Sequence, residues 1–343
     1  MLICASIKRC SVDAVRMVVT GAAGFIGAHV CAALVSAGHD VVAIDSFSPF
    51  HPRDLKQRRF DDLVGDRLGV VHEVDVADRP RLFAVMAARP VDVVIHLAAQ
   101  AGVRYSLQHP DACVATNVLG TYNVLSVASE LRVSRVLYAS SSSVYGATPG
   151  ECREDDLSVA PTTLYGATKL AGEVVARALW HSEGLRTIGL RLFTVYGEWG
   201  RPDMAYFRML EAALNDTTFP LMADLSVRRD FTYVDDVVQI VMALAERPDE
   251  FADPSLVVNV GGGAPCTLST LLATVEYVTS RRVRCREVLH TAGDVASTSA
   301  SSDLLGRLEL PVPRTPLAEG VSRVAQWMSP IADDARRWVD ATQ

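Results

Sequence analysis

Short apolar runs alternate with helical patterns along the first 195 residues of this chain. The runs are rich in β-branched side chains and lie at residues 16–20, 40–45, 69–75, 92–99, 135–141 and 186–193. Continuous apolar strands separated by helices are typical of a parallel sheet that is covered on both faces. The sequence therefore predicts a doubly wound α/β fold.

A glycine turn joins the first expected strand to the helix that follows it. The stretch "TGAAGFIG" places Gly21, Gly24 and Gly27 three residues apart. In such a turn glycine lets the backbone approach a pyrophosphate, which then faces the helix N-terminus. Asp45 ends the second strand eighteen residues after Gly27, where a carboxylate can bond the adenosine ribose hydroxyls and repel a 2′-phosphate. We therefore expect NAD as the cofactor, with Asp75 at the end of the third strand as a second acid near the adenine.

A second group of residues has the chemistry of proton transfer. The stretch "LYGATKLAGE" places Tyr165 and Lys169 four residues apart, on one face of a helix. A neighbouring ammonium stabilises a phenolate, which makes Tyr165 a usable base near neutral pH. The run "YASSSSVYG" ends an apolar strand about twenty residues earlier, and its Ser141 can hydrogen-bond the reacting hydroxyl, with Ser142 and Ser143 alongside it.

The regular alternation ends near residue 195, which sets the expected domain organisation. We expect an N-terminal extension at 1–15, a dinucleotide-binding domain at 16–195 and a smaller mixed α/β substrate domain at 196–343. Segments within about 230–262 are expected to return to the first domain. Further helices are predicted at 203–214, 235–246 and 268–280.

Composition narrows the class of protein. With 49% hydrophobic and 21% charged residues, the chain is typical of a globular protein, and its net charge of −7 disfavours a nucleic-acid-binding surface. The seven cysteines form no C-x-x-C pair and have no histidine cluster beside them, so we expect free thiols, no metal site and a reducing cytoplasm. There is no apolar run of the roughly 18 residues that a membrane span needs.

Taken together, these motifs resemble the extended short-chain dehydrogenase/reductases, in their group of NAD-dependent nucleotide-sugar epimerases and dehydratases. The resemblance runs from about residue 16 to 328 and includes "GAAGFIG", "HLAAQAGVRYS", "NVLGTYNVL", "SSSSVYG", "YGATK", "RRDFTYVDD" and "GDV". It implies a Rossmann domain with bound NAD, a C-terminal domain that binds a UDP-sugar, and a homodimer. The expected dimer helices are 111–132 and 163–183.

The resemblance also implies substrate-binding and cofactor-binding roles for individual residues. For the diphosphate it implies Arg229, for the uridine ribose Asp294, and for the phosphates or sugar Arg104. The expected cofactor site includes, besides the glycines, Asp45, Asp75, Tyr165 and Lys169, the residues Phe25, Ile26, Val76, Leu97, Ala98, Ala99, Asn117, Ala139, Ser140, Phe193 and Val195.

The stretch "FTVYGEWGRPDMA" resembles the UDP-glucuronate 4-epimerase subgroup, in which a Thr and the Arg seven residues later contact the sugar carboxylate. Here these residues are Thr194 and Arg201. A guanidinium is a fixed bidentate fork for a carboxylate, and a hydroxyl adds a third bond. A UDP-glucose/UDP-galactose 4-epimerase has no need of such an arginine. Two further alternatives are a UDP-glucuronate decarboxylase, which shares the first half-reaction but releases CO2, and a non-catalytic NAD-binding sensor. The sensor is disfavoured because it has no need of Tyr165 or Lys169.

Overall fold

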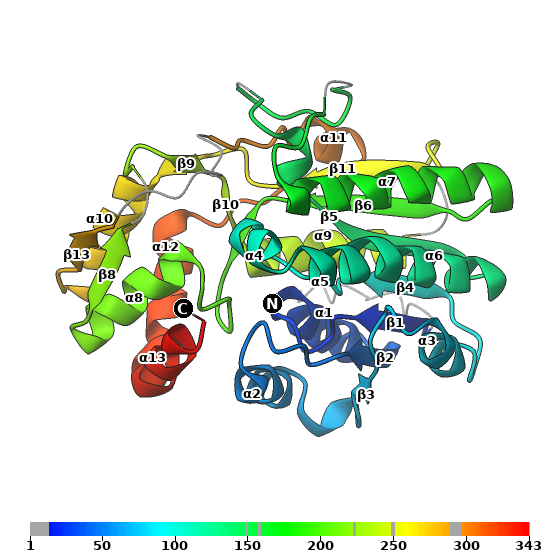
Figure 1. Cartoon of the computed structure of the whole chain (residues 1–343), viewed down its shortest axis with the longest axis horizontal. Coiled ribbons are helices and arrows are strands. Elements are labelled where there is room, and N and C mark those ends of the chain that lie inside the picture. The colour runs from blue at the N-terminus through cyan, green and yellow to red at the C-terminus, as the bar shows by residue number, and fades with distance from the viewer. Residues whose placement is uncertain are drawn as a thin grey trace, which may run out of the picture.

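A seven-stranded parallel sheet forms the centre of the computed structural model (Figure 1), which describes residues 14–148, 150–156, 159–221, 224–247, 251–288 and 297–342. The strands follow the order β11-β6-β5-β4-β1-β2-β3. They are β1 (Arg16–Thr20), β2 (Asp40–Asp45), β3 (His72–Glu73), β4 (Val93–His96), β5 (Arg135–Ser141), β6 (Thr187–Leu192) and β11 (Ser255–Val260). The strand order reverses at β1, which pairs with both β2 and β4, so a ligand crevice is expected at the carboxyl ends of these strands.

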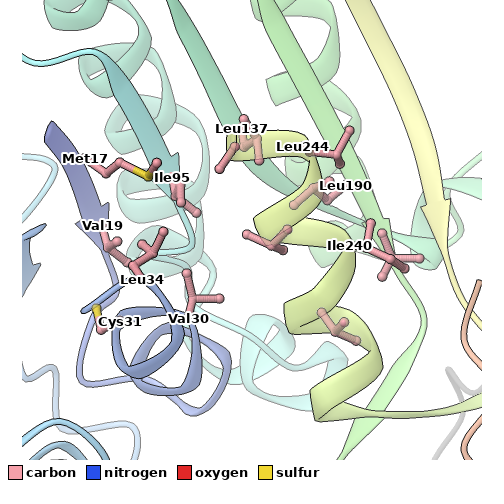
Figure 2. Close-up of a cluster of buried hydrophobic side chains, with 14 of the residues drawn as sticks. Met17, Val19, Val30, Cys31, Leu34, Ile95, Leu137, Leu190, Ile240 and Leu244 are labelled. Atoms are coloured by element: carbon pink, nitrogen blue, oxygen red, sulfur yellow. The ribbon is translucent and has the colours of Figure 1, made fainter. Parts of the chain in front are cut away.

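Helices cover both faces of the sheet, because side chains along each strand alternate between two apolar clusters. Met17 and Val19 of β1 pack in one cluster and Val18 in the other. The first cluster includes helices α1 (Phe25–Ser36) and α9 (Val234–Glu246). Figure 2 shows Val30 and Leu34 of α1, and Ile240 and Leu244 of α9, beside strand residues of this cluster. The second cluster includes α3 (Arg79–Met86), α6 (Thr121–Glu130) and α7 (Leu164–Glu183). The predicted doubly wound α/β fold is confirmed.

A smaller group of elements packs to the left of the sheet in Figure 1 around its own aromatic core. The core contains the buried side chains of Tyr206, Phe207 and Trp338. Its elements are α8 (Ala205–Asn215), β8 (Thr218–Leu221), α10 (Leu268–Thr279), β13 (Arg284–Glu287), α12 (Leu317–Met328) and α13 (Ala332–Asp340). The chain returns to the main sheet between these elements, where β11 pairs with β6.

The strand expected at 92–99 ends at His96, and two predicted elements differ more from the structure. The strand expected at 69–75 is limited to His72–Glu73, and Val70 is 80% exposed. This strand lies at the edge of the sheet and pairs with β2 alone, so one side of it has no ladder to extend. The helix expected at 111–132 is divided into α5 (Pro110–Val114), a π-helical segment at Ala115–Gly120, and α6. Among the described residues no helix is long and apolar enough to span a membrane.

Candidate active site

The glycine turn follows β1 at the carboxyl ends of the strands, where the strand order reverses. Gly21 has φ of +71°, and a Cβ built on it would lie 2.6 Å from the amide nitrogen of Ala98. A Cβ on Gly27 would lie 2.0 Å from the carbonyl oxygen of Gly21, so any side chain there would push α1 away from the turn. The turn therefore packs against Leu97 and Ala98, which follow β4.

Two features of this turn fit a dinucleotide. No side chain caps the N-terminus of α1 at Gly24, so the amides of the first turn remain available to a pyrophosphate. Asp45 is buried at the end of β2, and its carboxylate accepts hydrogen bonds from the amides of Ala23 (3.0 Å) and Phe47 (2.7 Å). A carboxylate accepts about four hydrogen bonds, so Asp45 can still receive the ribose hydroxyls.

Asp75 lies farther along the same edge of the sheet. Its side chain is exposed and accepts a hydrogen bond from the amide of Ala77 (2.9 Å). Val76, the next residue, is buried against the π-helical segment, since a Cβ on Gly120 would lie 2.6 Å from Val76 Cγ2. Asp75 therefore caps a turn that leads away from the shortened strand β3.

Helix α7 carries Tyr165 and Lys169 to the carboxyl end of β5. The helix begins at Leu164 and is capped by Thr163, whose hydroxyl accepts a hydrogen bond from the amide of Gly166 (3.1 Å). A Cβ on Gly166 would lie 2.5 Å from the carbonyl oxygen of Ser143. Glycine between the tyrosine and the lysine therefore lets α7 approach the serine run closely. Lys169 Nζ donates to the carbonyl oxygen of Ala139 (2.9 Å), which fixes the ammonium beside the strand end.

Burial and local charge act in opposite directions on these two residues. Burial raises the pKa of Tyr165, while the positive charge of Arg201 and a hydrogen bond with Ser141 lower it. Burial lowers the pKa of Lys169 to about 8. The sequence predicts that Lys169 stabilises the phenolate. In the structure Lys169 Nζ lies 6.0 Å from the centre of the Tyr165 ring, and the positive charge that lowers the pKa of Tyr165 is that of Arg201. The influence of Arg201 on Tyr165 could not be read from the sequence, because the two residues lie on different elements.

A buried ion pair between Glu173 and Arg191 contacts the first serine of the serine run, Ser140. Glu173 accepts hydrogen bonds from Ser140 (2.5 Å) and from the Nε and Nη2 of Arg191 (3.0 and 2.8 Å). The side chains of Glu173 and Arg191 are 7% and 6% exposed, so the pair is shielded from solvent screening. The guanidinium also stacks over the ring of Tyr145, with 4.7 Å between the carbon and the ring centre. Ser140 is thus held from α7, while Ser141 accepts a hydrogen bond from the amide of Ser143 (3.1 Å).

Asn117 occupies the π-helical segment and joins three parts of the site. Its side chain accepts from the amide of Gln100 (2.8 Å) and donates to the carbonyl oxygen of Gln100 (3.1 Å) and to Thr168 Oγ1 (3.1 Å). Asn117 is 1% exposed, and the structure gives it the role of linking the β4 loop to α7. A π-helical turn is often found at a functional site, and here it delivers the amide that makes this link.

Sequence reasoning missed two buried residues near the glycine turn and the end of β4. His96 at the end of β4 bonds Thr20 through Nδ1 (2.7 Å) and Thr121 through Nε2 (3.1 Å), and burial lowers its pKa to about 3. Arg59 in α2 (Arg53–Leu63) donates to the carbonyl oxygens of Ala23 (2.9 Å) and Trp199 (2.7 Å). Arg59 therefore ties the glycine turn to the loop before Arg201.

The stretch from Thr194 to Arg201 enters the site from the substrate side. Thr194 begins β7 (Thr194–Tyr196), which pairs with β10 (Phe231–Tyr233), and it is half-buried. Arg201 forms a bidentate pair with Asp203, in which Nε lies 3.1 Å from Oδ1 and Nη2 lies 2.6 Å from Oδ2. The sequence did not predict this pair, although its two members are only two residues apart.

The remaining predicted residues are distributed around this centre. Arg104 is exposed near the start of α4 (Val103–Gln108), and Arg229 is half-buried in β9 (Arg228–Arg229). Phe193 and Val195 are buried on either side of Thr194. Phe25 and Ile26 are in the first turn of α1, Ser142 is in the 3-10 turn after β5, and Asp294 lies outside the described residues.

The doubly wound sheet, the glycine turn and the tyrosine–lysine helix define a dinucleotide-binding enzyme of the short-chain dehydrogenase/reductase type. Comparison with known proteins gives the family. The sequence profile of the NAD dependent epimerase/dehydratase family matches residues 17–261. The chain belongs to this family.

Individual relatives share most of the chain. A probable UDP-glucuronate 4-epimerase of Rhizobium meliloti (strain 1021) is 38% identical over 328 residues, which cover 91% of this chain and 96% of the relative. UDP-glucuronate 4-epimerase 3 of Arabidopsis thaliana is 36% identical over 91% of this chain and 76% of its own length. The crystal structure of the UDP-glucuronic acid 4-epimerase from Bacillus cereus, in complex with UDP-glucuronic acid and NAD, is 30% identical with a TM-score of 0.84, covering 92% of this chain and 99% of that one.

Proposed function

We infer that the chain is a UDP-glucuronate 4-epimerase, which interconverts UDP-glucuronate and UDP-galacturonate. The observation that carries this inference is the position of the Arg201 guanidinium, whose charge lowers the pKa of Tyr165 against the effect of burial. A carboxylate-binding group thus lies within electrostatic reach of the base. The names and bound sugar nucleotide of the relatives described above agree with this activity.

NAD would be held by the glycine turn at the start of α1 and by Asp45, and it would supply reversible hydride chemistry at C4 of the sugar with no net redox change. Of the chain's own residues, Tyr165 accepts the proton of the 4-hydroxyl and later gives it back. Ser141 hydrogen-bonds Tyr165 and supports its charged form. Lys169, held by the carbonyl oxygen of Ala139, offers its remaining N–H groups to the nicotinamide ribose.

Arg201 and Thr194 hold the carboxylate of the sugar in this proposal. Oxidation at C4 produces a β-keto acid, which loses CO2 when the C–CO2 bond lies perpendicular to the plane of the ketone. A guanidinium and a hydroxyl that fix both carboxylate oxygens keep the bond out of that orientation. The same two groups release the carboxylate when the 4-keto sugar turns over, and hold it again on the other face.

The nucleotide end of the substrate is bound by the smaller domain. We propose that Arg229 and Arg104 face the diphosphate, and that Asp294 bonds the uridine ribose. Arg229 lies in β9, which pairs with β12 (Cys266–Thr267); both strands belong to the part of the chain that the sequence predicted as the substrate domain. The charge of Arg104 lowers the pKa of Arg208 on α8, in addition to the larger effect of burial, so Arg104 faces the smaller domain.

We also propose that the enzyme is a homodimer in the cytoplasm. Large apolar side chains are exposed along α5, the π-helical segment, α6 and α7, where a second copy would cover them: Val114, Leu119, Tyr122 and Val174. The cysteines within the described part of the chain are free thiols, as a reducing compartment would keep them.

The activity is tested by incubating the purified protein with UDP-glucuronate without added NAD. The sugar nucleotides are then separated by chromatography with mass detection. A product of unchanged mass that co-elutes with UDP-galacturonate is the expected result, and Tyr165→Phe should reduce its rate at least about a hundredfold. A loss of 44 mass units would make the protein a decarboxylase instead. Conversion of UDP-glucose alone would contradict the roles of Thr194 and Arg201.

A further inference from the structure

Arg201 is the end of a chain of three polar side chains. Its guanidinium pairs with Asp203, and Asp203 Oδ1 also accepts a hydrogen bond from His51 Nε2 (3.1 Å). His51 lies before α2, 152 residues away in sequence from Asp203. The side chains of His51, Asp203 and Arg201 are 10%, 27% and 22% exposed, so these three side chains are largely shielded from water.

The ion pair with Asp203 occupies one edge of the Arg201 guanidinium, and the other edge is available to a second carboxylate. Asp203 occupies Nε and Nη2, which are two of the five N–H directions of an arginine. The edge formed by Nη1 and the second hydrogen of Nη2 can still receive another carboxylate in bidentate fashion. Arg201 can therefore hold Asp203 and a sugar carboxylate at the same time.

The plane of the guanidinium is confined as well. Its carbon lies 5.8 Å from the centre of the Phe50 ring, and Gly102 approaches so closely that a Cβ there would lie 3.3 Å from Nη2. Phe50 in turn packs against Tyr105, with ring centres 4.4 Å apart. These contacts limit rotation about the last bonds of Arg201, while Asp203 sets the direction in which the remaining edge points.

His51 stabilises the acceptor in this arrangement. Burial lowers the pKa of His51 to about 4, so the ring is neutral near pH 7 and its Nε2–H donates to Asp203. Burial alone would raise the pKa of Asp203, but the charge of Arg201 and the hydrogen bonds from His51 and Arg201 outweigh it and hold that pKa below its usual range. Asp203 is therefore an anion held from two sides.

We propose that Asp203, supported by His51, is a positioning residue that aims the free edge of Arg201 at the carboxylate of the sugar. The proposal rests on the function inferred above. The preference for a carboxylated sugar would then depend on three hydrogen-bonded side chains, His51, Asp203 and Arg201, and not on Arg201 alone. Without Asp203 the arginine would keep its charge but lose the fixed direction of its fork.

A pair of ligands that differ only in the carboxylate tests this role. UDP-xylose is UDP-glucuronate without its carboxylate, so the ratio of the two dissociation constants isolates the contribution of that group. Both constants are measured by calorimetry in a Tyr165→Phe background, in which conversion of a ligand is expected to be at least about a hundredfold slower. We expect Asp203→Asn to reduce the preference for UDP-glucuronate about tenfold, which corresponds to about 1.4 kcal/mol, and to leave UDP-xylose binding unchanged.

Matched variants separate positioning from folding. His51→Gln keeps an N–H donor and should retain most of the preference, whereas His51→Phe should lose several-fold. Glu130→Gln, which removes the carboxylate of a remote pair with Arg79 (2.7 Å), should change nothing. An unchanged or stronger preference in Asp203→Asn, or equal weakening of both ligands, would overturn the proposal. If the background protein itself shows no preference for UDP-glucuronate, the carboxylate site of the proposed function fails instead.

Discussion

Arg59 Nε lies 2.7 Å from the carbonyl oxygen of Trp199, although the two residues are 140 positions apart. The same guanidinium donates to the carbonyl oxygens of Ala23 (2.9 Å) and Gly200 (3.3 Å), and the residue is 1% exposed. A single buried side chain thus joins the glycine turn of the cofactor site to the residue that precedes Arg201.

Replacing Arg59 should therefore affect both stability and substrate binding. Arg59→Met leaves three carbonyl oxygens without their donor, which outweighs the relief of the burial that lowers the pKa of Arg59 to about 10. We therefore expect the free energy of unfolding to fall by about 3 kcal/mol. Since Arg201 follows the released loop, the KM for UDP-glucuronate should rise more than kcat falls. Urea denaturation and steady-state kinetics measure the two effects. Arg89→Met serves as the control, because Arg89 is an exposed partner of Asp40.

The parts of this site that were predictable from the sequence are those that depend on local pattern. Gly21, Asp45 and Tyr165 each follow from residues within one strand–turn–helix unit, because the turn, the strand end and the helix face are set locally. The hydrogen bond from His51 to Asp203 could not be predicted, since it depends on how two distant loops meet. The same holds for Arg59, whose acceptors are backbone atoms and leave no trace in the pattern of side chains.

The fold shows the same division. Most strands of the main sheet are apolar and buried, so a local apolar pattern indicates their positions, and β1, β2 and β5 have the predicted bounds; the exposed strand β3 is the exception. By contrast, β13 has the sequence Arg-Cys-Arg-Glu and is exposed along its whole length. It pairs with β8, but no alternation of apolar and polar residues in its sequence predicts this pairing. Small strands of this kind are set by long-range pairing, which a single sequence does not reveal.

Lys169 should be a site where function costs stability. Its pKa is about 8 in the folded chain, below its ordinary 10.5, so the folded state binds that proton less tightly than the unfolded state does. Below pH 8 both states are charged and the folded state bears the whole cost, which disappears as pH rises from 8 to 10.5. Lys169→Met should therefore stabilise NAD-free protein at pH 7 by about 2 kcal/mol, after loss of the Ala139 hydrogen bond, while activity falls by at least about a hundredfold.

Urea denaturation of both proteins from pH 7 to 10 tests this expectation. The wild-type protein should gain stability between pH 8 and 10 relative to Lys169→Met, because only the wild-type protein contains this titrating group. Equal pH dependence in the two proteins, or a less stable variant at pH 7, would contradict it.

Two buried histidines should make the fold sensitive to acid. Burial lowers the pKa of His51 to about 4 and that of His96 to about 3, both below the ordinary 6.5. As pH falls below 6.5 the unfolded chain takes up protons that the folded chain does not, so stability is lost. Each histidine should cost about 2 kcal/mol by pH 5. The slope of unfolding free energy against pH near 5 should fall by about one proton in His51→Gln, and a slope unaffected by this variant would contradict the prediction.

The exposed apolar face along α5, the π-helical segment, α6 and α7 predicts how the proposed homodimer should be disrupted. Val174 on α7 is 62% exposed, and Leu119 and Tyr122 on the neighbouring elements are 48% and 45% exposed. A second copy that covers this face would bury each of them, and a charge placed there would be buried without a partner. We expect Val174→Glu to shift the mass in solution, measured by light scattering, from two chains to one. Val70→Glu is the matched control, since Val70 is 80% exposed at the far edge of the sheet. A dimer that survives Val174→Glu, or one that Val70→Glu dissociates, would place the interface elsewhere on the molecule.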